Sequence, residues 1–486
     1  MIPLAYRLRD PVQLKRAPQG NWLVISPLPL AVLRINDAGA RLVESTRGGA
    51  SVPDMARSLG LSEEAVLGFC ERLRERGFLE VSRAVLESTP CPTVTVIIPT
   101  RDRALELDEC LAALSRLDYP REKIEVIVVD DGSSDPASVR KVTERRACRL
   151  LVNEKNRGPA YSRNRAAREA SGEILAFIDS DCVPEPSWLK ELTPYFLWQR
   201  VGAVGGRTLG YYNRSFLDRY EEVASPLDMG GHLRFEGRST SSFYVPTCNL
   251  LVRTSLYRTL GGFREHLRVG EDVDLCLRLR ESGAYLLYAP EGVVRHKHRR
   301  RLSQLLRQRA DYGRSEAVLY RLHPEMRKSL PHELGALTTT LALTLGVARK
   351  DPRLLLLAGT VMAGSVLEKR RRVRKAGLVV SLRQASLSVL RGHLSMLYFV
   401  NFHLVRYHLL TLALLGLPFK RAWAVGGFAT AVSGTVDYVV RQPRLPYPAY
   451  LACYLAEHVA YQLGVSVGCL KERTLRPYAI RVARGS

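Results

Sequence analysis

The sequence predicts an α/β fold built around a doubly wound sheet. Three observations predict it: short β-branched runs end in polar turns, leucines at helical spacing lie between them, and a further apolar run ends in two carboxylates. The expected elements alternate in the order strand 94–100, helix 105–117, strand and turn 125–133, helix 137–146 and strand 174–178. Ligands of such sheets bind beyond the carboxyl ends of the strands, where we expect Thr100, Asp131 and Asp179 to gather.

The run 174–178 ends in Asp179-Ser180-Asp181. Hard cations such as Mg²⁺ and Mn²⁺ prefer carboxylate oxygens and often complete their shell with substrate phosphate. The pair therefore predicts a divalent metal and a nucleotide-linked substrate. Isolated Asp-x-Asp sequences also occur in solvated turns and helix caps, so the neighbouring segments must decide.

Two of those segments carry candidate donor contacts. Asp131 ends the second expected strand, where an aspartate can accept the N3–H of a uracil ring; an ordinary Asp-Gly turn is the alternative. Arg163 follows a turn and opens a helix, and its guanidinium can form a bidentate contact with a diphosphate. The alternative for Arg163 and Arg165 is a charged helix surface, which we prefer for Arg165.

Acidic residues also open an expected helix near 270–279. Glu271, Asp272 and Asp274 exceed what a helix cap needs, although a dipole-stabilised cap remains the alternative. A general base that deprotonates an acceptor hydroxyl needs one carboxylate near the donor's anomeric carbon, and Asp272 is the candidate. Downstream, a strand near 289–298 delivers His296, which is either a metal ligand or an ordinary surface or core histidine.

From Pro92 to His298 the motifs stand in one order: Val-Ile-Ile-Pro-Thr-Arg-Asp-Arg, Val-Val-Asp-Asp-Gly-Ser, Asn-Arg-Gly-Pro-Ala-Tyr-Ser-Arg-Asn, Phe-Ile-Asp-Ser-Asp, Val-Gly-Gly-Arg, Pro-Thr-Cys-Asn-Leu-Leu and Gly-Glu-Asp-Val-Asp-Leu-Cys. This series resembles the family 2 glycosyltransferases, which implies the nucleotide-sugar-binding GT-A fold with a doubly wound mixed sheet. One departure is Gly270, where many members carry Thr.

The resemblance also implies roles. Asp131 reads the base, Asp179 and Asp181 engage the ribose and the metal-bound diphosphate, and Asp272 is the base of a single inverting displacement. The full assignment is Pro99, Thr100, Arg101, Asp131, Arg163 and Asp179 for the donor, Asp179, Asp181 and His296 for a Mn²⁺ or Mg²⁺ ion, and Asp272 with Glu271 for catalysis.

Residues 1–88 form a separate expected domain. A helix capped at Asn36 or Asp37, helices 51–59 and 62–76, and a strand at 77–81 indicate a winged-helix-like module. It resembles the peptide-binding chaperone domain of the pyrroloquinoline-quinone pathway, which implies recognition of a precursor peptide. A DNA-binding winged helix is the alternative, but the arginines of the last helix alternate with glutamates, as on a solvated face.

Such a module joined to a family 2 catalytic domain (92–300) resembles the glycosyltransferases that modify peptide-derived redox cofactors. The resemblance implies oligoglucosylation of the cofactor precursor from UDP-glucose, with β-1,4 linkages. The alternatives are a polysaccharide or lipid-linked glycosyltransferase and, in a different class, a nucleic-acid-binding or scaffold protein. Carboxylates at successive strand ends argue against that last class, and no nucleic acid partner is expected.

Residues 301–486 are expected to be basic, helical and membrane-associated. The chain carries 72 Lys and Arg against 48 Asp and Glu, a net charge of +24, and basic runs at 299–301 and 369–375 alternate with apolar stretches. We expect contact with the anionic cytoplasmic face of the cell membrane, peripherally or with one or two short spans. A soluble helical domain is the alternative. Nine cysteines without a Cys-x-x-Cys pair, and no expected signal peptide, favour the reducing cytoplasm.

Overall fold

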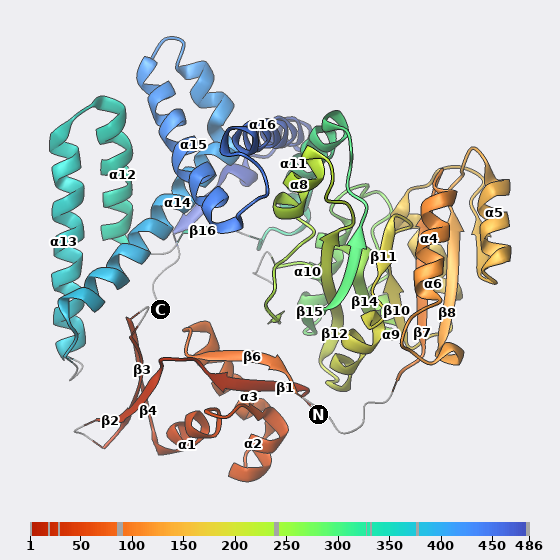
Figure 1. Ribbon diagram of the computed structural model, residues 1–486, viewed down its shortest axis with the longest axis horizontal. Helices are drawn as coiled ribbons and strands as arrows, with labels where there is room; N and C mark the ends of the chain where they lie inside the picture. Colours follow the sequence, from red (N-terminus) through yellow and green to blue (C-terminus); the bar gives the residue numbers. More distant parts are fainter. Residues whose placement is uncertain are drawn as a thin grey trace. The chain divides into compact units, whose positions relative to one another are not determined.

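The computed structural model of the chain describes residues 2–17, 20–27, 30–84, 91–237, 243–326, 328–330, 333–375 and 379–482 (Figure 1). Two compact units make up the chain. The sheet unit comprises residues 88–328 and 441–481, and the helical unit comprises 1–87, 329–440 and 482–486. The expected domain boundary at Ser88 lies outside the described residues.

One mixed sheet organises the sheet unit, in the order β11-β15-β12-β14-β10-β7-β8-β9, with β13 also paired to β15. The strands that carry the predicted motifs are β7 (Val94–Thr100), β8 (Ile124–Asp130), β9 (Arg149–Val152), β10 (Ile174–Phe177) and β15 (Tyr285–His296). The others are β11 (Cys182–Pro184), β12 (Val201–Gly210), β13 (Arg234–Glu236) and β14 (Leu250–Arg253). The predicted doubly wound mixed sheet is present.

The order of the parallel strands reverses beside β7. β7 pairs in parallel with β8, and β8 with β9, whereas β10 returns to the other side of β7. β14 then runs antiparallel to both β10 and β12. The carboxyl ends of β7 and β10 therefore flank a topological switch point, where α/β sheets bind ligands.

Helices and an apolar core fix these strand ends. The helices next to the sheet are α4 (Ala104–Leu114), α5 (Pro136–Arg145), α6 (Pro159–Glu169), α7 (Trp188–Leu192), α8 (Phe216–Ala224), α9 (Thr254–Thr259) and α10 (Glu271–Glu281). α4 and α5 confirm the helices predicted over 105–117 and 137–146, within a few residues. Phe177 on β10 is fully buried, with ring centroids 5.3 Å from Tyr257 and 5.2 Å from Phe263, so the end of β10 is held rigidly.

Two further helices belong to the sheet unit, α11 (Leu302–Leu322) and α16 (Tyr447–Glu472). Their backbones touch. A Cβ on Gly313 would lie 2.1 Å from the carbonyl oxygen of Tyr461, and one on Gly464 would lie 1.9 Å from that of Ala310. The sheet unit thus includes residues 301–328 and 441–481, which the sequence analysis placed in a separate C-terminal region.

The N-terminal part of the helical unit contains the predicted helices α1 (Asp37–Ser45), α2 (Val52–Leu59) and α3 (Glu63–Glu75), and the predicted wing strand β6 (Leu79–Arg83). The side chains of Asn36, Ser51 and Ser62 cap the three helices. β6 pairs with β1 (Leu4–Leu8), which also pairs with β5 (Ala50–Ser51). A second sheet, of β2 (Gln13–Arg16), β3 (Trp22–Pro27) and β4 (Leu30–Ile35), was not predicted.

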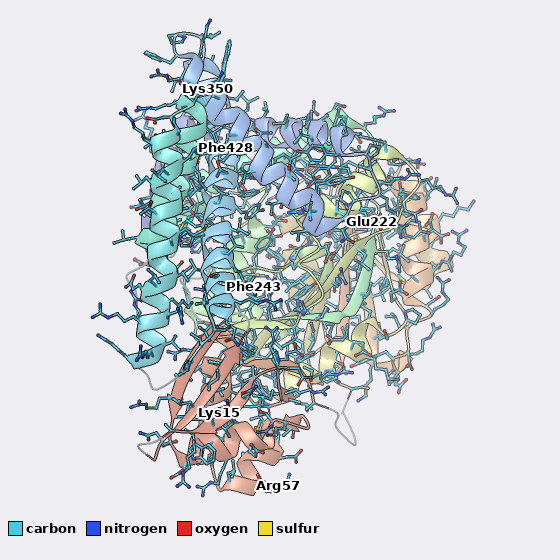
Figure 2. The ribbon with its side chains drawn as sticks, turned by 60° about the vertical axis from the view of Figure 1, so that its left-hand side comes forward. Lys15, Arg57, Glu222, Phe243, Lys350 and Phe428 are labelled. Atoms are coloured by element: carbon cyan, nitrogen blue, oxygen red, sulfur yellow. The ribbon has the colours of Figure 1, made fainter. Side chains whose placement is uncertain are left out.

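The rest of the helical unit consists of α12 (Leu334–Arg349), α13 (Pro352–Lys375), α14 (Leu382–Leu415) and α15 (Lys420–Arg441). α12 and α13 form a hairpin (Figure 1), and its turn lies at Lys350, whose backbone is left-handed with φ 54° (Figure 2). Short strands β16 (Lys328–Leu330) and β17 (Ile480–Val482) lie where the chain passes between units. Across the described helices, none combines the length and apolarity needed to cross a membrane.

Candidate active site

A cleft of about 420 Å³ lies at the switch point. Its lining residues include Glu271 and all the residues that were predicted to contact the donor, which are Pro99, Thr100, Arg101, Asp131, Arg163 and Asp179. Because β7, β8 and β10 run in parallel, the turns that follow them meet at one edge of the sheet. Asp272, Asp181 and His296 are not among the residues that line this cleft.

Asp131 shapes one wall of the cleft. Its Oδ1 atom accepts hydrogen bonds from the amide of Asn153 (2.8 Å) and the backbone N–H of Arg157 (2.9 Å), and its Oδ2 atom accepts one from Gly158 (2.8 Å). Gly132 (φ 71°) allows the loop to approach closely, since a Cβ there would lie 2.7 Å from the carbonyl carbon of Lys155. A carboxylate oxygen has two lone pairs, so Oδ2 can accept a second hydrogen bond.

Arg163 lies between two carboxylates. Its guanidinium donates to Asp179 Oδ1 at 2.6 Å and to Glu271 Oε1 at 3.0 Å, and the residue is only 3% exposed. Burial alone would lower the pKa of Arg163, but the two carboxylates raise it above its ordinary value. The sequence analysis gave Arg163 a diphosphate contact; the structure adds that it ties α6 to the end of β10 and the start of α10.

The three acidic residues in the first turn of α10 differ in environment. Asp274 is fully buried and bonded to Arg278 (2.8 Å) and His323 (2.9 Å), so it has a structural role. Burial raises the pKa of Glu271 to about 7, and the charge of Asp272 adds to that effect. Burial also raises the pKa of Asp272, whose Oδ1 accepts a hydrogen bond from the backbone N–H of Val273 (2.8 Å). A carboxylate with a raised pKa is suited to accept a proton.

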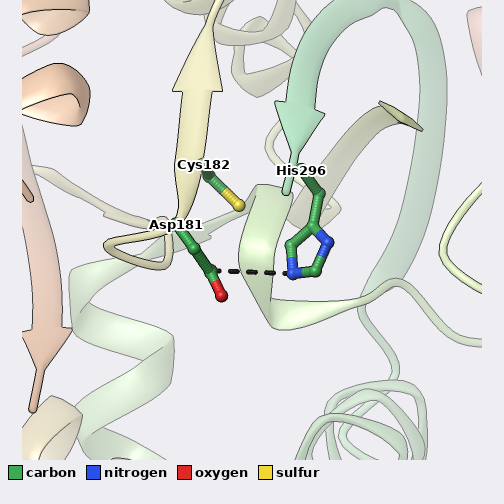
Figure 3. A group of neighbouring side chains, drawn as sticks. All are labelled: Asp181, Cys182 and His296. Carbon is green, nitrogen blue, oxygen red and sulfur yellow. Dashed lines mark ion pairs between the residues drawn. The ribbon is translucent and has the colours of Figure 1, made fainter. Parts of the chain in front are cut away.

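A metal-binding geometry surrounds Asp181. One ligand atom each of Asp181, Cys182 and His296 lies within 4.8 Å of the others (Figure 3), and His296 Nε2 is 3.6 Å from Asp181 Oδ1. Within the described residues, that Oδ1 is buried without a hydrogen-bond partner. An unpaired buried carboxylate oxygen is costly, so the site fits a cation. Burial raises the pKa of the Cys182 thiol well above its ordinary value, so Asp181 and His296 are the better ligands for a hard ion.

Arg103 is a site residue that the sequence analysis missed. It lines the cleft and donates a hydrogen bond to Asp181 Oδ2. The preceding residue, Asp102, has a left-handed backbone (φ 55°), and its carboxylate accepts hydrogen bonds from the backbone and hydroxyl of Ser134, both at 2.7 Å. This turn directs Arg103 into the site. The sequence could have indicated Arg103, because it is a basic residue just beyond the end of β7, within the motif Val-Ile-Ile-Pro-Thr-Arg-Asp-Arg.

Comparison with known proteins shows the family of the chain. Residues 95–260 match the model of glycosyl transferase family 2. The chain is 30% identical over 424 residues to the "Pre-mycofactocin glycosyltransferase" of Mycobacterium tuberculosis, which covers 83% of this chain and 87% of that protein. The chain belongs to the pre-mycofactocin glycosyltransferases of family 2. The predicted α/β GT-A fold class and the predicted transferase activity are therefore confirmed.

Other relatives match smaller shares of the chain. Glycosyltransferase AglE of Haloferax volcanii is 28% identical over 238 residues, which span 48% of this chain and 75% of that protein. Among solved structures, the mannosyltransferase PcManGT from Pyrobaculum calidifontis, in complex with GDP-Man and Mn²⁺, has 21% identity and a TM-score of 0.39, with 71% of this chain and 87% of that one covered. TarS 1–349 of S. aureus with UDP has 21% identity and a TM-score of 0.35, with 46% and 64% covered.

Proposed function

We propose that this glycosyltransferase transfers glucose from UDP-glucose to premycofactocin, or to a related small-molecule acceptor, and builds a β-1,4-linked oligoglucoside. The observation that carries the proposal is the cleft at the switch point. It places a carboxylate able to read a base, Asp131, beside Asp179 and the acidic start of α10. The Mycobacterium relative, named for the same acceptor, matches most of the chain and supports the choice of acceptor.

The residues act in an in-line displacement. Asp131 and the loop it organises hold the nucleotide, and Asp272 takes the proton from the acceptor hydroxyl. The acceptor oxygen forms a bond to the anomeric carbon as the bond from that carbon to the diphosphate oxygen breaks, so UDP leaves and the configuration inverts. Acid–base catalysis by Asp272 contributes about 100-fold to 10,000-fold.

Asp181 and His296 are the residues that would hold the divalent ion, Mn²⁺ or Mg²⁺. When bound, such an ion supplies Lewis-acid stabilisation of the negative charge that develops on the departing diphosphate. Arg103 adds positive charge at the same place because its guanidinium lies against Asp181. Arg163 keeps Asp179 and Glu271 in fixed positions through its two ion pairs.

The proposal is tested by turnover of purified protein with UDP-glucose, UDP-galactose, UDP-N-acetylglucosamine and GDP-mannose, with Mn²⁺ or Mg²⁺ and with EDTA. We expect metal-dependent release of UDP from UDP-glucose, stimulated by premycofactocin, and a product that a β-glucosidase degrades. The alternative, a polysaccharide or lipid-linked glycosyltransferase, predicts stimulation only by a glycan or lipid-linked acceptor. No metal-dependent binding of any nucleotide sugar would overturn the catalytic proposal.

We also propose that the enzyme works at the cytoplasmic face of the cell membrane. The turn between α14 and α15 exposes a cluster of large apolar side chains, and two basic residues follow it directly. The exposed apolar residues are Leu414 (67%), Leu417 (70%), Phe419 (65%) and Trp423 (51%). The basic residues Lys420 and Arg421 lie between Phe419 and Trp423 in the chain. Apolar side chains beside basic ones suit an anionic lipid surface. Flotation with phosphatidylglycerol vesicles should recover the protein, and vesicles of phosphatidylcholine alone should recover less.

The N-terminal module is proposed to recognise a precursor peptide. Its three capped helices and paired strands β1 and β6 agree with the predicted winged-helix-like arrangement. Binding of a labelled precursor peptide to the full chain, measured by fluorescence anisotropy, tests the proposal. Absence of saturable binding at high micromolar protein would contradict it.

A further inference from the structure

A row of buried polar side chains leads from the cluster of Asp181, Cys182 and His296 to helices α11 and α16 of the sheet unit. His296 Nδ1 lies 3.1 Å from His298 Nδ1, and His298 Nδ1 lies 3.8 Å from Glu221 Oε2. Arg309 of α11 then donates to Glu221 Oε1 (2.5 Å) and to Glu457 Oε2 of α16 (3.1 Å). All five residues are less than 9% exposed.

The contact between the two histidines constrains both rings. A hydrogen bond between two ring nitrogens needs one proton, carried by one of them. If His296 Nε2 is to offer a lone pair to a cation, its proton must be on Nδ1, and His298 Nδ1 must then accept. Ligating histidines commonly donate their second N–H to such a partner, which fixes the tautomer and the ring orientation.

The remaining residues fix the position of Glu221, whose Oε2 packs 3.8 Å from His298 Nδ1, beyond hydrogen-bond distance. Arg309 is about 2% exposed. Burial alone would lower its pKa, but the carboxylates of Glu457 and Glu221 raise the pKa above its ordinary value. Glu457 also accepts a hydrogen bond from the hydroxyl of Tyr220 at 3.2 Å. The backbone contact of α11 with α16, through Gly313 and Gly464, leaves little freedom for Arg309 to move relative to Glu457.

We propose that His298, supported by Glu221, Arg309 and Glu457, is a positioning residue that orients His296 toward the cation held with Asp181. The inference rests on the proposed metal-dependent function and adds a role for α11 and α16 in it. A merely structural role for these buried residues would affect stability without a selective effect on metal affinity.

The first test measures Mn²⁺ binding to the full chain by isothermal titration and by electron paramagnetic resonance, without sugar or acceptor. His298→Phe removes the acceptor and should weaken Mn²⁺ binding by about 10-fold to 100-fold, as for other residues that contact metal ligands. His298→Asn places an amide oxygen near the position of Nδ1 and should retain most of the affinity. Thermal melting and metal-free UDP binding show whether each variant is folded.

The second test addresses α16. Glu457→Gln should weaken Mn²⁺ binding in the same direction, whereas Cys469→Ser, at a buried position on the same helix, should not change it. Equal Mn²⁺ affinity in folded His298→Phe and the unmodified enzyme would overturn the inference and leave the proposed function standing. Absence of Mn²⁺ binding by the unmodified enzyme would instead overturn the metal site itself.

Discussion

The guanidinium of Arg163 lies 3.0 Å from the carboxylate of Glu271, although 108 residues separate them in the chain. The pair joins α6 to the start of α10, and Arg163 also holds Asp179. Removal of one partner of a buried ion pair leaves an uncompensated charge, which typically costs about 3–5 kcal/mol. We expect Arg163→Ala to lower the free energy of unfolding by about this amount and to weaken UDP binding.

Arg168→Ala is the matched control, because Arg168 lies on the same helix with an exposed side chain. Urea denaturation and UDP titration of both variants test the prediction. Equal stability of the two variants would show that the pair does not hold the site together.

Replacement of Asp272 by asparagine keeps the shape of the side chain but removes its ability to accept a proton. We expect kcat to fall by about 100-fold to 10,000-fold while UDP binding is unchanged. Steady-state transfer and UDP titration measure the two effects. Unchanged transfer would show that another group is the base.

The pH dependence of kcat should reflect the raised pKa of Asp272. A base must be deprotonated to act, so activity is present above this pKa and is lost as the pH falls through it. Because burial raises the pKa, the loss should occur above the ordinary aspartate value of about 3.9. A profile that stays flat down to about pH 3.9 would contradict this account.

Gly270 has a left-handed backbone (φ 83°), and a Cβ there would lie 3.1 Å from Leu319 of α11. Gly270→Ala should cost about 1–2 kcal/mol of stability and lower kcat, because it displaces Glu271 and Asp272.

Gly283, just beyond the other end of α10, gives a close control. Its backbone is also left-handed (φ 86°), but a Cβ there would have no neighbour within 4 Å. Gly283→Ala should therefore cost similar stability without the loss of kcat. Equal kcat values for the two variants, measured at a temperature where both are folded, would show that the position of Gly270 does not affect the acidic pair.

The composition of the metal site can be tested at Asp181 and Cys182, which are adjacent in the chain. Asp181→Asn should abolish the increase in UDP affinity that Mn²⁺ causes, whereas Cys182→Ser should preserve it, because a hard ion does not need the thiol. UDP titration with Mn²⁺ or EDTA distinguishes the two. Loss of the Mn²⁺ effect in Cys182→Ser would make the thiol a ligand and would point to a softer metal.

The central sheet was predictable because its strands are continuous apolar runs that end in charged turns. Val94–Thr100 is buried on both faces along most of its length, and Ile124–Asp130 is buried from Ile127 onward. The N-terminal helices were predictable from their caps, such as Ser51 and Ser62. Strands β1 to β4 were not predicted, although they are no shorter than the predicted β10.

Within the site, the sequence located the strand-end carboxylates but not their partners. The turn that holds Asp131 combines the Asp-Gly geometry with a specific set of hydrogen bonds, so the two interpretations of that motif are compatible. The pairing of Arg163 with Glu271 depends on how α6 and α10 pack, which local patterns do not encode. His298 and Glu457 lie even further apart in the chain, and the contacts through Glu221 and Arg309 that connect them are visible only in the tertiary structure.

The sheet unit is discontinuous, because the chain leaves it after Lys328 and re-enters it at Arg441. Residues 329–440 therefore form one continuous insertion between the two segments of the sheet unit. A recombinant fragment that stops near residue 300 would lack both Arg309 and Glu457 and would leave Glu221 buried without its cation. A shortened enzyme should instead retain residues 88–328 and 441–481 and replace the intervening block with a flexible linker.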